Sequence, residues 1–228
     1  MQANPGKGCG EEDDTRPIAI LFTGGKDSVY TLLKARKDLG GIYKAVIIEP
    51  SLPQPNPHTK NINIVVEIAK LLETHPVIVS GGKPEELVKA VNCSRAIVAG
   101  DIYLLDHVEW LSRVAEEAGI PIVYEPLFNA DTRRLLKEVV YTGIEFTVIG
   151  VGHKDYADLI GFHVTKKTLP AFLELIDKHG IDPMGEYAEY HTFINKAPGY
   201  QWRIKYNIKN VKTEAGWLYS ILEYKVTL

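Results

Sequence analysis

The residues best suited to chemistry form a short glycine-containing loop near the start of the chain, Thr23-Gly24-Gly25-Lys26-Asp27-Ser28. The loop directly follows the apolar run Ile18–Phe22, which predicts a strand, and it precedes a stretch with helical periodicity. Because glycines lack a Cβ, backbone N–H groups can approach a polyphosphate closely, and the N-terminus of the next helix adds a favourable dipole. Lys26 adds a mobile positive charge. The loop therefore predicts a site for nucleotide phosphates.

Asp27 sets this loop apart from a Walker A loop, which places four residues between its first glycine and Gly-Lys-Ser/Thr. A carboxylate beside phosphates is repulsive unless a divalent cation bridges the two, or unless the acid holds backbone N–H groups of the loop. We therefore expect Asp27 to act in catalysis, either as an Mg²⁺ ligand or as an organiser of the loop. The structural alternative is that Asp27 or Ser28 caps the following helix.

A second polar cluster lies far along the chain, in the segment Gly185–Thr192. This segment holds two carboxylates, two phenols, an imidazole and a hydroxyl. If Tyr190–Ile194 is a strand, side-chain alternation puts Glu189 and His191 on one face, where an acid and the histidine can act together. We expect the segment to fold back over the glycine loop and complete a site. The alternative is a half-exposed strand whose polar groups are satisfied locally.

A third group of polar residues follows another predicted strand. Gly100 and Asp101 come directly after that strand, on a loop expected to face a nucleotide. Asp106 and Glu109 either belong to the same site or form an acidic version of a capping box at the start of the next helix. His107, which stands alone, is expected to be a solvated residue of the first helical turn.

Short β-branched runs alternate with amphipathic stretches, and this pattern predicts a doubly wound α/β fold with a parallel sheet. Ligands of such sheets gather at the carboxyl ends of the strands, so we expect adenine near Leu21 and Ile47. The expected strands are Ile18–Phe22, Lys44–Ile48, Pro76–Val79, Ala96–Ala99, Pro121–Tyr124 and Phe146–Val151, and the expected helices are Val29–Leu39, Ile62–Glu73, Pro84–Val91, His107–Ala118 and Asp131–Tyr141.

The pattern changes gradually beyond about Asn129, which suggests a division of the chain into three regions. Residues 1–16 have almost no large apolar side chain and are expected to be a flexible extension. Residues 17–128 are expected to form the nucleotide-binding α/β domain. Residues 129–228 are expected to form a smaller C-terminal α+β substrate subdomain, with a helix from Thr168–Pro170 to about Gly180 and strands at Gln201–Val211 and Gly216–Leu228.

Composition limits the classes of partner. The chain has 228 residues, is 45% hydrophobic and carries a net charge of -3. This balance gives no general basic field, so a nucleic-acid partner is not expected. No stretch approaches the ~20 apolar residues that span a bilayer, so we expect no membrane partner. Cys9 and Cys93 form no C-x-x-C pair and no disulfide framework, which favours a reducing compartment and a cytoplasmic protein.

The glycine loop resembles the S-G-G-x-D-S loop of the PP-loop ATP pyrophosphatases, with Thr23 keeping the hydroxyl of the usual first serine. The resemblance implies the HUP-like fold of that superfamily and binding of ATP with Mg²⁺. It also implies that ATP is cleaved between its α- and β-phosphates, so that a substrate is adenylated and pyrophosphate is released. The residues that it assigns to the phosphates are Thr23, Gly24, Gly25, Lys26, Asp27 and Ser28.

A narrower resemblance, from about Ile18 to about Pro198, is to the diphthine ammonia ligase branch of these proteins. It implies ATP-dependent amidation of diphthine, the modified histidine of translation elongation factor 2, by ammonia. The chain departs from the branch at Pro57–Asn63, at Asp101–His107 and in the closing motif, where Ala188 replaces glycine and His191 replaces glutamate. The resemblance rests on Glu125-Pro126-Leu127-Phe128, Leu135-Leu136-Lys137-Glu138, Tyr141-Thr142-Gly143 and Gly185-Glu186-x-x-Glu189-Tyr190-His191-Thr192.

In this interpretation a substrate carboxylate attacks the α-phosphate, and ammonia captures the acyl-adenylate. Glu186, Glu189 and His191 are predicted to position the acceptor and to deprotonate ammonium, because a base must expose the nitrogen lone pair. Two alternative functions stay open: a ligase that acts on another small carboxylate, and a sensor that binds ATP without turnover. A tRNA thiolase is disfavoured because Cys93 has no partner cysteine nearby in the sequence, and a lysidine-type ligase because no basic RNA-binding domain is present. A homodimer also stays open.

Overall fold

The computed structural model describes residues 15–49, 56–80 and 83–228, so nearly all of the expected N-terminal extension lies outside the described residues. The first layer is a parallel sheet with strand order β3-β2-β1-β4-β5. The strand order reverses between β1 and β4, which is where a doubly wound sheet opens a crevice for its ligand. The strands are β1 (Ile18–Leu21), β2 (Tyr43–Glu49), β3 (His75–Ser80), β4 (Ala96–Val98) and β5 (Val123–Tyr124).

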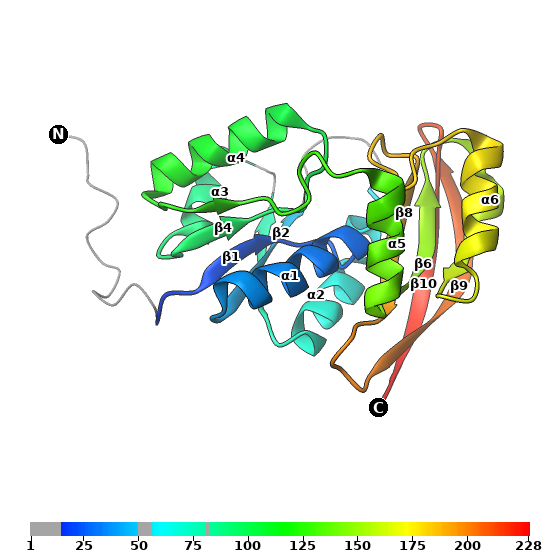
Figure 1. Cartoon of the computed structure of the whole chain (residues 1–228), viewed down its shortest axis with the longest axis horizontal. Coiled ribbons are helices and arrows are strands. Elements are labelled where there is room, and N and C mark those ends of the chain that lie inside the picture. Colours follow the sequence, from blue (N-terminus) through cyan, green and yellow to red (C-terminus); the bar gives the residue numbers. More distant parts are fainter. Residues whose placement is uncertain (1–14, 50–55, 81–82) are drawn as a thin grey trace.

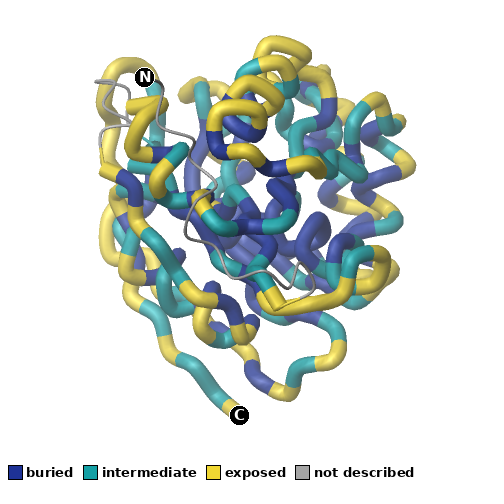
Figure 2. Tube along the Cα trace, turned by 90° about the vertical axis from the view of Figure 1, so that its left-hand side faces the viewer, coloured by how far each residue is buried: buried dark blue, intermediate teal, exposed yellow. Residues whose placement is uncertain are grey.

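Helices cover both faces of this sheet (Figure 1). Strand alternation divides the apolar side chains between two clusters. Ile20 and Ile47 pack with a pair of helices on one face of the sheet, the first pair. Ala19 and Val46 pack with a pair on the other face, the second pair. Figure 2 shows the buried residues gathered in the middle of the molecule. The predicted doubly wound α/β fold is confirmed. The first pair is α1 (Lys26–Leu39) and α2 (Ile62–Leu71), and the second pair is α3 (Pro84–Val91) and α4 (Leu105–Ala118).

The C-terminal part forms a second, antiparallel sheet with the order β7-β6-β10-β9, and β8 pairs with β6. The strand expected at Phe146–Val151 belongs here and not to the parallel sheet. A buried apolar run looks the same in either sheet, so the sequence could not decide its partners. The elements are α5 (Thr132–Thr142), β6 (Glu145–Val151), β7 (His163–Val164), α6 (Leu169–His179), β8 (Tyr190–Lys196), β9 (Arg203–Glu214) and β10 (Trp217–Thr227), with short 3₁₀ turns η2 (Thr59–Asn61) and η3 (Lys154–Leu159).

One apolar cluster runs through both sheets. It contains Ile18 of β1, Leu136 of α5, Phe146 of β6 and Phe172 of α6, all fully buried. Such a shared core resists relative movement of the two sheets, because any shift would expose apolar surface. The domain division near residue 128 stays a prediction.

Two expectations from composition can be compared with the described residues. Within them, no helix is long and apolar enough to cross a membrane. Cys93 is disulfide-bonded, so the expectation that the chain has no disulfide is wrong.

Gly100 allows the end of β4 to lie close against α1. A Cβ at this position would lie 2.6 Å from Oγ1 of the fully buried Thr31. We expect Gly100→Ala to lower the free energy of unfolding by about 1–3 kcal/mol, a typical cost of overpacking. Adding Thr31→Ala should restore most of the loss, because it removes the clashing atom. Urea denaturation of both single variants and the double variant measures this. A double variant no more stable than Gly100→Ala would contradict the steric explanation.

Candidate functional site

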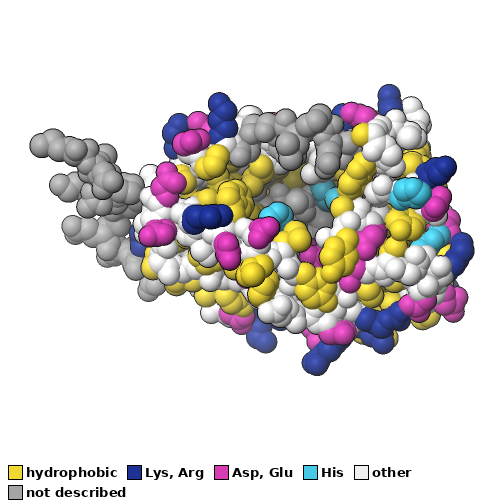
Figure 3. All heavy atoms as spheres, turned by 90° about the horizontal axis from the view of Figure 1, so that it is seen from above, with side chains coloured by type: hydrophobic (Ala, Val, Ile, Leu, Met, Phe, Trp, Pro, Cys, Tyr) yellow, Lys and Arg dark blue, Asp and Glu magenta, His cyan; other side chains and the backbone are white. Residues whose placement is uncertain are grey.

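A cleft of about 750 Å³ opens at the carboxyl ends of β1 and β4. Its walls come from the glycine loop, from residues 99–101, from the start of α4 and from residues 184–192. Figure 3 looks onto the face where the molecule is hollowed, with acidic, histidine and hydrophobic side chains around the hollow. The cleft therefore joins segments that are far apart in the sequence, at the position expected for a ligand site of this fold.

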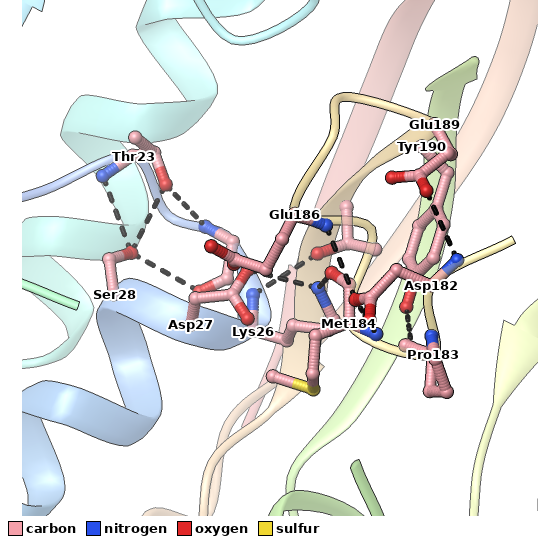
Figure 4. Close-up of polar contacts among 12 residues, drawn as sticks. Thr23, Lys26, Asp27, Ser28, Asp182, Pro183, Met184, Glu186, Glu189 and Tyr190 are labelled. Carbon is pink, nitrogen blue, oxygen red and sulfur yellow. Dashed lines mark hydrogen bonds and ion pairs between the residues drawn. The ribbon is translucent and has the colours of Figure 1, made fainter. Parts of the chain in front are cut away.

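The glycine loop is closed by the hydroxyl groups at its two ends (Figure 4). Ser28 Oγ accepts from Thr23 N at 3.3 Å and donates to Gly25 O at 3.2 Å, while Thr23 Oγ1 accepts from Gly25 N at 3.3 Å. Gly24 has a φ of +74°, which suits glycine. The N-cap of α1 is Gly25, which makes no side-chain cap. The alternative in which Asp27 or Ser28 caps the helix is therefore wrong.

The predicted fold-back of the late segment over this loop is confirmed. Thr192 Oγ1 accepts a hydrogen bond from Lys26 N at 3.1 Å, and Ile194 N donates to Gly24 O at 3.2 Å. Figure 4 shows the chain from Asp182 to Tyr190 directly beside the loop. These contacts bring Glu186 and His191 into the lining of the same cleft as Thr23, Asp27 and Ser28.

Lys26 is not the mobile charge that the sequence suggested. It is 1% exposed, and its Nζ donates to Met184 O at 2.6 Å and to Asp27 Oδ2 at 2.9 Å. The ammonium group also lies 4.8 Å from the centre of the Tyr190 ring. Residues 182–192, called the covering segment from here on, hold Lys26 in place, and the lysine in turn orients Asp27. Direct contact of Lys26 with phosphates stays a prediction.

Asp27 is suited to a cation bound together with phosphates. Its Oδ1 is buried and has no hydrogen-bond partner among the described residues, and the residue lines the cleft. Mg²⁺ in nucleotide sites commonly uses one or two carboxylates and completes its shell with phosphate oxygens and water. Within the described residues, no group of three or more His, Cys, Asp or Glu could hold a metal. Asp27 therefore fits Mg²⁺ that arrives with a nucleotide.

Glu186 lies in an environment that disfavours its charge. Burial, followed by the negative charge of Asp27, raises the pKa of its carboxyl to about 7, although Lys26 and a backbone hydrogen bond from Ile102 oppose the shift. Asp101 adds a smaller increase. A carboxyl that titrates near neutral pH can both accept and release a proton there, as acid–base catalysis requires.

The raised pKa predicts a pH-dependent effect of Glu186→Gln on stability. The folded state holds the proton more tightly than the unfolded state, so wild type loses stability as the pH rises from about 4.5 to about 7. The glutamine variant lacks this loss. We expect its melting temperature to exceed that of wild type at pH 8.5 and the gap to shrink at pH 5. Thermal scans measure this, and a gap that does not depend on pH would contradict the assignment.

Glu189 was expected to act together with His191, but its carboxylate is bound to backbone groups instead. Its two carboxylate oxygens accept hydrogen bonds from the backbone N–H groups of Asp182, at 3.0 Å, and Tyr187, at 2.9 Å. Asp182 Oδ1 in turn accepts from Met184 N at 2.8 Å. Glu189 thus holds the covering segment in shape with these backbone partners and does not pair with His191. Its predicted catalytic role stays a prediction.

The structure pairs His191 with a residue that the sequence analysis missed, His58. Their rings meet edge to face with centroids 5.3 Å apart, and both residues line the cleft. Burial, followed by the charge of Lys26, lowers the pKa of His191 to about 4, and burial followed by His191 lowers that of His58 well below its usual value. His58 Nδ1 and His191 Nε2 are buried without hydrogen-bond partners among the described residues. Two neutral imidazoles therefore face the site.

His58 could not be assigned from sequence because its position depends on a distant strand. Asn61 donates from Nδ2 to Pro57 O and to Ser220 O, each at 2.9 Å, and its Oδ1 accepts from Leu222 N at 3.1 Å. These bonds tie η2 to β10. The only sequence signal was the departure of Pro57–Asn63 from the branch pattern.

Besides these polar groups, the cleft has a set of apolar lining residues that suits a purine ring. Leu21 lines it as expected, but Ile47 does not, because its side chain is 3% exposed and packs with the α1 and α2 cluster. Its two neighbours on β2 point the other way, as strand alternation requires. The apolar lining comprises Leu21, Val46, Ile48, Leu104, Trp110 and Leu111.

The polar residues near α4 divide into two groups. Gly100, Asp101 and His107 line the cleft, and Asp101 Oδ1 lies 3.0 Å from His107 Nδ1. Hydrogen bonding to Asp101 raises the pKa of His107, so this histidine is not simply solvated. Asp106 and Glu109 are exposed. Because the N-cap of α4 is Leu104 and makes no side-chain cap, the capping-box alternative for Asp106 and Glu109 is wrong.

Comparisons with known proteins cover both halves of the chain. Residues 16–122 match the family model for the diphthamide synthase N-terminal domain, and residues 131–226 match the model for the diphthamide synthase C-terminal domain. A comparison with curated proteins gave no match.

Two solved structures are distantly similar. One is a predicted subunit of tRNA methyltransferase from Methanocaldococcus jannaschii, at 14% identity and a TM-score of 0.42, covering 79% of this chain and 98% of that one. The other is the U34-tRNA thiolase NcsA from Methanococcus maripaludis with its [4Fe-4S] cluster, at 15% identity and a TM-score of 0.36, covering 60% of this chain and 62% of that one.

Proposed function

Because this chain belongs to the diphthamide synthase family, we propose that it is an ATP-dependent ligase that converts diphthine on translation elongation factor 2 into diphthamide, with ammonium as the nitrogen source. AMP and pyrophosphate are the other products, and the reaction takes place in the cytoplasm, where translation occurs. The observation that carries the proposal is that Glu186, an acid of raised pKa, and His191, a half-buried histidine of lowered pKa, line the same cleft as the glycine loop.

The loop and the apolar end of the cleft would hold ATP. The N-terminus of α1 and the loop amides favour the phosphates, and Trp110 and Leu21 offer apolar contact to adenine. Mg²⁺ bound with ATP would neutralise part of the charge on the pyrophosphate leaving group. Asp27, which Lys26 holds, would contact that cation, and its Oδ1 has no hydrogen-bond partner among the described residues. An acceptor carboxylate that attacks the α-phosphorus would then form an acyl-adenylate.

The second half-reaction needs free ammonia beside the acyl-adenylate. An ammonium ion has no lone pair, so a base must remove one proton before nitrogen can attack the acyl carbon. Glu186 is suited to this because its pKa lies near 7. His58 Nδ1 and His191 Nε2 can accept hydrogen bonds from ammonium, because both imidazoles stay neutral at physiological pH. The three side chains together would bind ammonium and release ammonia.

Two alternatives remain in view. A ligase acting on another small carboxylate is favoured by the histidine at position 191, where the branch commonly has glutamate. An ATP-binding sensor without turnover would keep the loop but not need a base over it, so the raised pKa of Glu186 argues against it.

Product analysis tests the proposal. The full chain is incubated with Mg²⁺-ATP, ammonium chloride and elongation factor 2 that carries diphthine, and phosphorus NMR follows the nucleotides while mass spectrometry weighs the factor. We expect AMP and pyrophosphate only when the factor is present, with a loss of about 1 Da from the factor as an amide replaces an acid. ADP and inorganic phosphate as primary products would overturn the α–β cleavage. AMP with no mass change in the factor would favour another acceptor.

A further inference from the structure

The cleft proposed to hold ATP is short of positive charge. Among the described residues that line it, none is a lysine or an arginine, whereas Asp27, Asp101 and Glu186 are acids. Lys26 belongs to the glycine loop, but it is 1% exposed and its Nζ is bound to Met184 O and to Asp27. A triphosphate carries several negative charges, which the acids of the lining repel. A further cation in the lining would offset this repulsion.

Three histidines line the cleft, and their surroundings favour different charges. Burial lowers the pKa of both His58 and His191, so these two rings stay neutral near physiological pH. Hydrogen bonding to Asp101 raises the pKa of His107, although partial burial opposes the shift. Within the described part of the lining, His107 is therefore the side chain that can carry a positive charge near neutral pH.

The contact with Asp101 leaves one ring nitrogen of His107 for a ligand. Nδ1 lies 3.0 Å from Asp101 Oδ1, and it is the only nitrogen of this ring with a hydrogen bond among the described residues. The side chain of His107 is 58% exposed and that of Asp101 is 21% exposed. In the protonated ring both nitrogens are donors, so Nδ1–H binds the carboxylate and Nε2–H stays available. The pair then presents a donor to the cleft.

The charged groups that act on His107 come from four parts of the fold, and all of them are acids. Asp101 lies on the loop after β4, and Asp106 is its neighbour in the first turn of α4. Glu186 acts on it from the covering segment. Glu125, which follows β5, has a pKa that the charge of His107 lowers in turn. Each of these carboxylates favours the imidazolium over the neutral ring.

The place of His107 on α4 relates it to the purine end of the cleft. Trp110 and Leu111 follow it by three and four residues, so they lie on the same face of the helix, and both line the cleft. A nucleotide with adenine on these side chains and its terminal phosphates at the glycine loop has its α-phosphate in between. We propose that the imidazolium of His107, held by Asp101, binds this α-phosphate, so that nucleotide affinity rises when the side chain takes up a proton.

This inference rests on the proposed use of ATP and deepens it. A charge-assisted hydrogen bond to phosphate is roughly twice as strong as a neutral one, so the protonated ring contributes more affinity than the neutral ring. The α-phosphorus is the atom attacked in adenylation, so the same contact would stabilise charge that develops on its oxygens. Because the pKa of His107 is raised above 6.5, the contribution should persist at neutral pH and be lost in the alkaline range.

Nucleotide binding without any acceptor tests the subsite. Calorimetry on the full chain compares wild type with His107→Gln, using Mg²⁺-ATP, AMP and adenosine as ligands. We expect glutamine to weaken binding of ATP and AMP ~10-fold at about pH 6.5 and less than ~2-fold at about pH 9.5, with adenosine unaffected at both. Comparing the two proteins at the same pH cancels the titration of the phosphates and of Glu186, because both proteins share them.

Three further variants sharpen the test. His107→Arg carries its charge at both pH values, so its advantage over His107→Gln should not depend on pH. Asp101→Asn removes the partner that raises the pKa of His107, so an NMR titration of the ring should give a lower pKa than in wild type. His153→Gln is the matched control and should bind nucleotides normally, since His153 is 54% exposed and pairs with Asp155 outside the cleft lining.

The outcomes separate this subsite from the proposed function. Unchanged ATP affinity in His107→Gln, an equal loss for adenosine, or a loss that is the same at both pH values overturns the subsite, even if diphthamide is formed. A loss for ATP without one for AMP overturns the assignment to the α-phosphate. A pH-dependent loss confined to phosphorylated ligands supports the subsite, even if the product analysis finds no diphthamide. Binding of no nucleotide to wild type overturns both proposals.

Discussion

Replacing Asp27 with asparagine is expected to lower acceptor-dependent AMP formation by roughly 10³-fold or more. The substitution removes the negative charge that faces the cleft, while its amide can still accept one hydrogen bond from Lys26. The cation that accompanies ATP would lose its protein ligand, and the leaving pyrophosphate would be less well neutralised. Stability should change little or rise, since the negative charge of Asp27 opposes ionisation of Glu186.

The measurement is AMP release at saturating Mg²⁺ and acceptor, with ATP affinity followed by calorimetry using α,β-methylene ATP. Asp106→Asn is the matched control, because Asp106 also lies in the first turn of a helix but is exposed and does not line the cleft. Near-normal activity of Asp27→Asn would show that the carboxylate has only a structural role. Loss of activity in the Asp106 variant as well would point to a general electrostatic effect.

Glu186→Gln is expected to lower acceptor-dependent AMP formation or amide formation by ~10²-fold or more while ATP binding is kept. The amide preserves the shape of the side chain and can still accept a hydrogen bond, but it cannot take a proton from ammonium. If Glu186 is the base, wild-type activity should rise as the pH increases through about 7, where the carboxyl loses its proton in the free enzyme. The variant should lack this step.

A single-turnover experiment locates the defect. The enzyme is first allowed to form adenylated acceptor, and ammonium or hydroxylamine is then added; hydroxylamine attacks without needing a base at neutral pH. We expect hydroxylamine to rescue the Glu186→Gln variant and ammonium not to. Glu109→Gln, an exposed acid on α4, serves as the control. Equal defects with both nucleophiles would assign Glu186 to acceptor positioning.

The two substitutions act on neighbouring carboxylates, so their effects should not be additive. Asp27 is the largest electrostatic contributor, after burial, to the raised pKa of Glu186. Removing its charge should lower that pKa and shift the activity profile of any residual turnover to lower pH. The pH profile of Asp27→Asn therefore tests whether the two groups interact as the geometry indicates.

Local chemistry in the sequence was enough to place the glycine loop between its strand and its helix, and to predict the first sheet. The loop, its strand and its helix are consecutive in the chain, so glycine spacing and apolar periodicity report them directly. The same holds for the helix bounds, which lie within a few residues of the expected ones. The carboxyl-end position of the cleft follows from the handedness and order of parallel strands.

Only the tertiary structure decided which distant groups meet. The sequence could not place β6 in the antiparallel sheet or bring His58 beside His191, because both depend on pairings with strands far along the chain. It also could not show that Lys26 is held under Met184, that Glu189 bonds to backbone amides, or that Ile47 faces the core. Residue types and spacing determine what chemistry is available. Burial and long-range contacts determine which charges are held, which are shifted in pKa and which are left to meet a ligand.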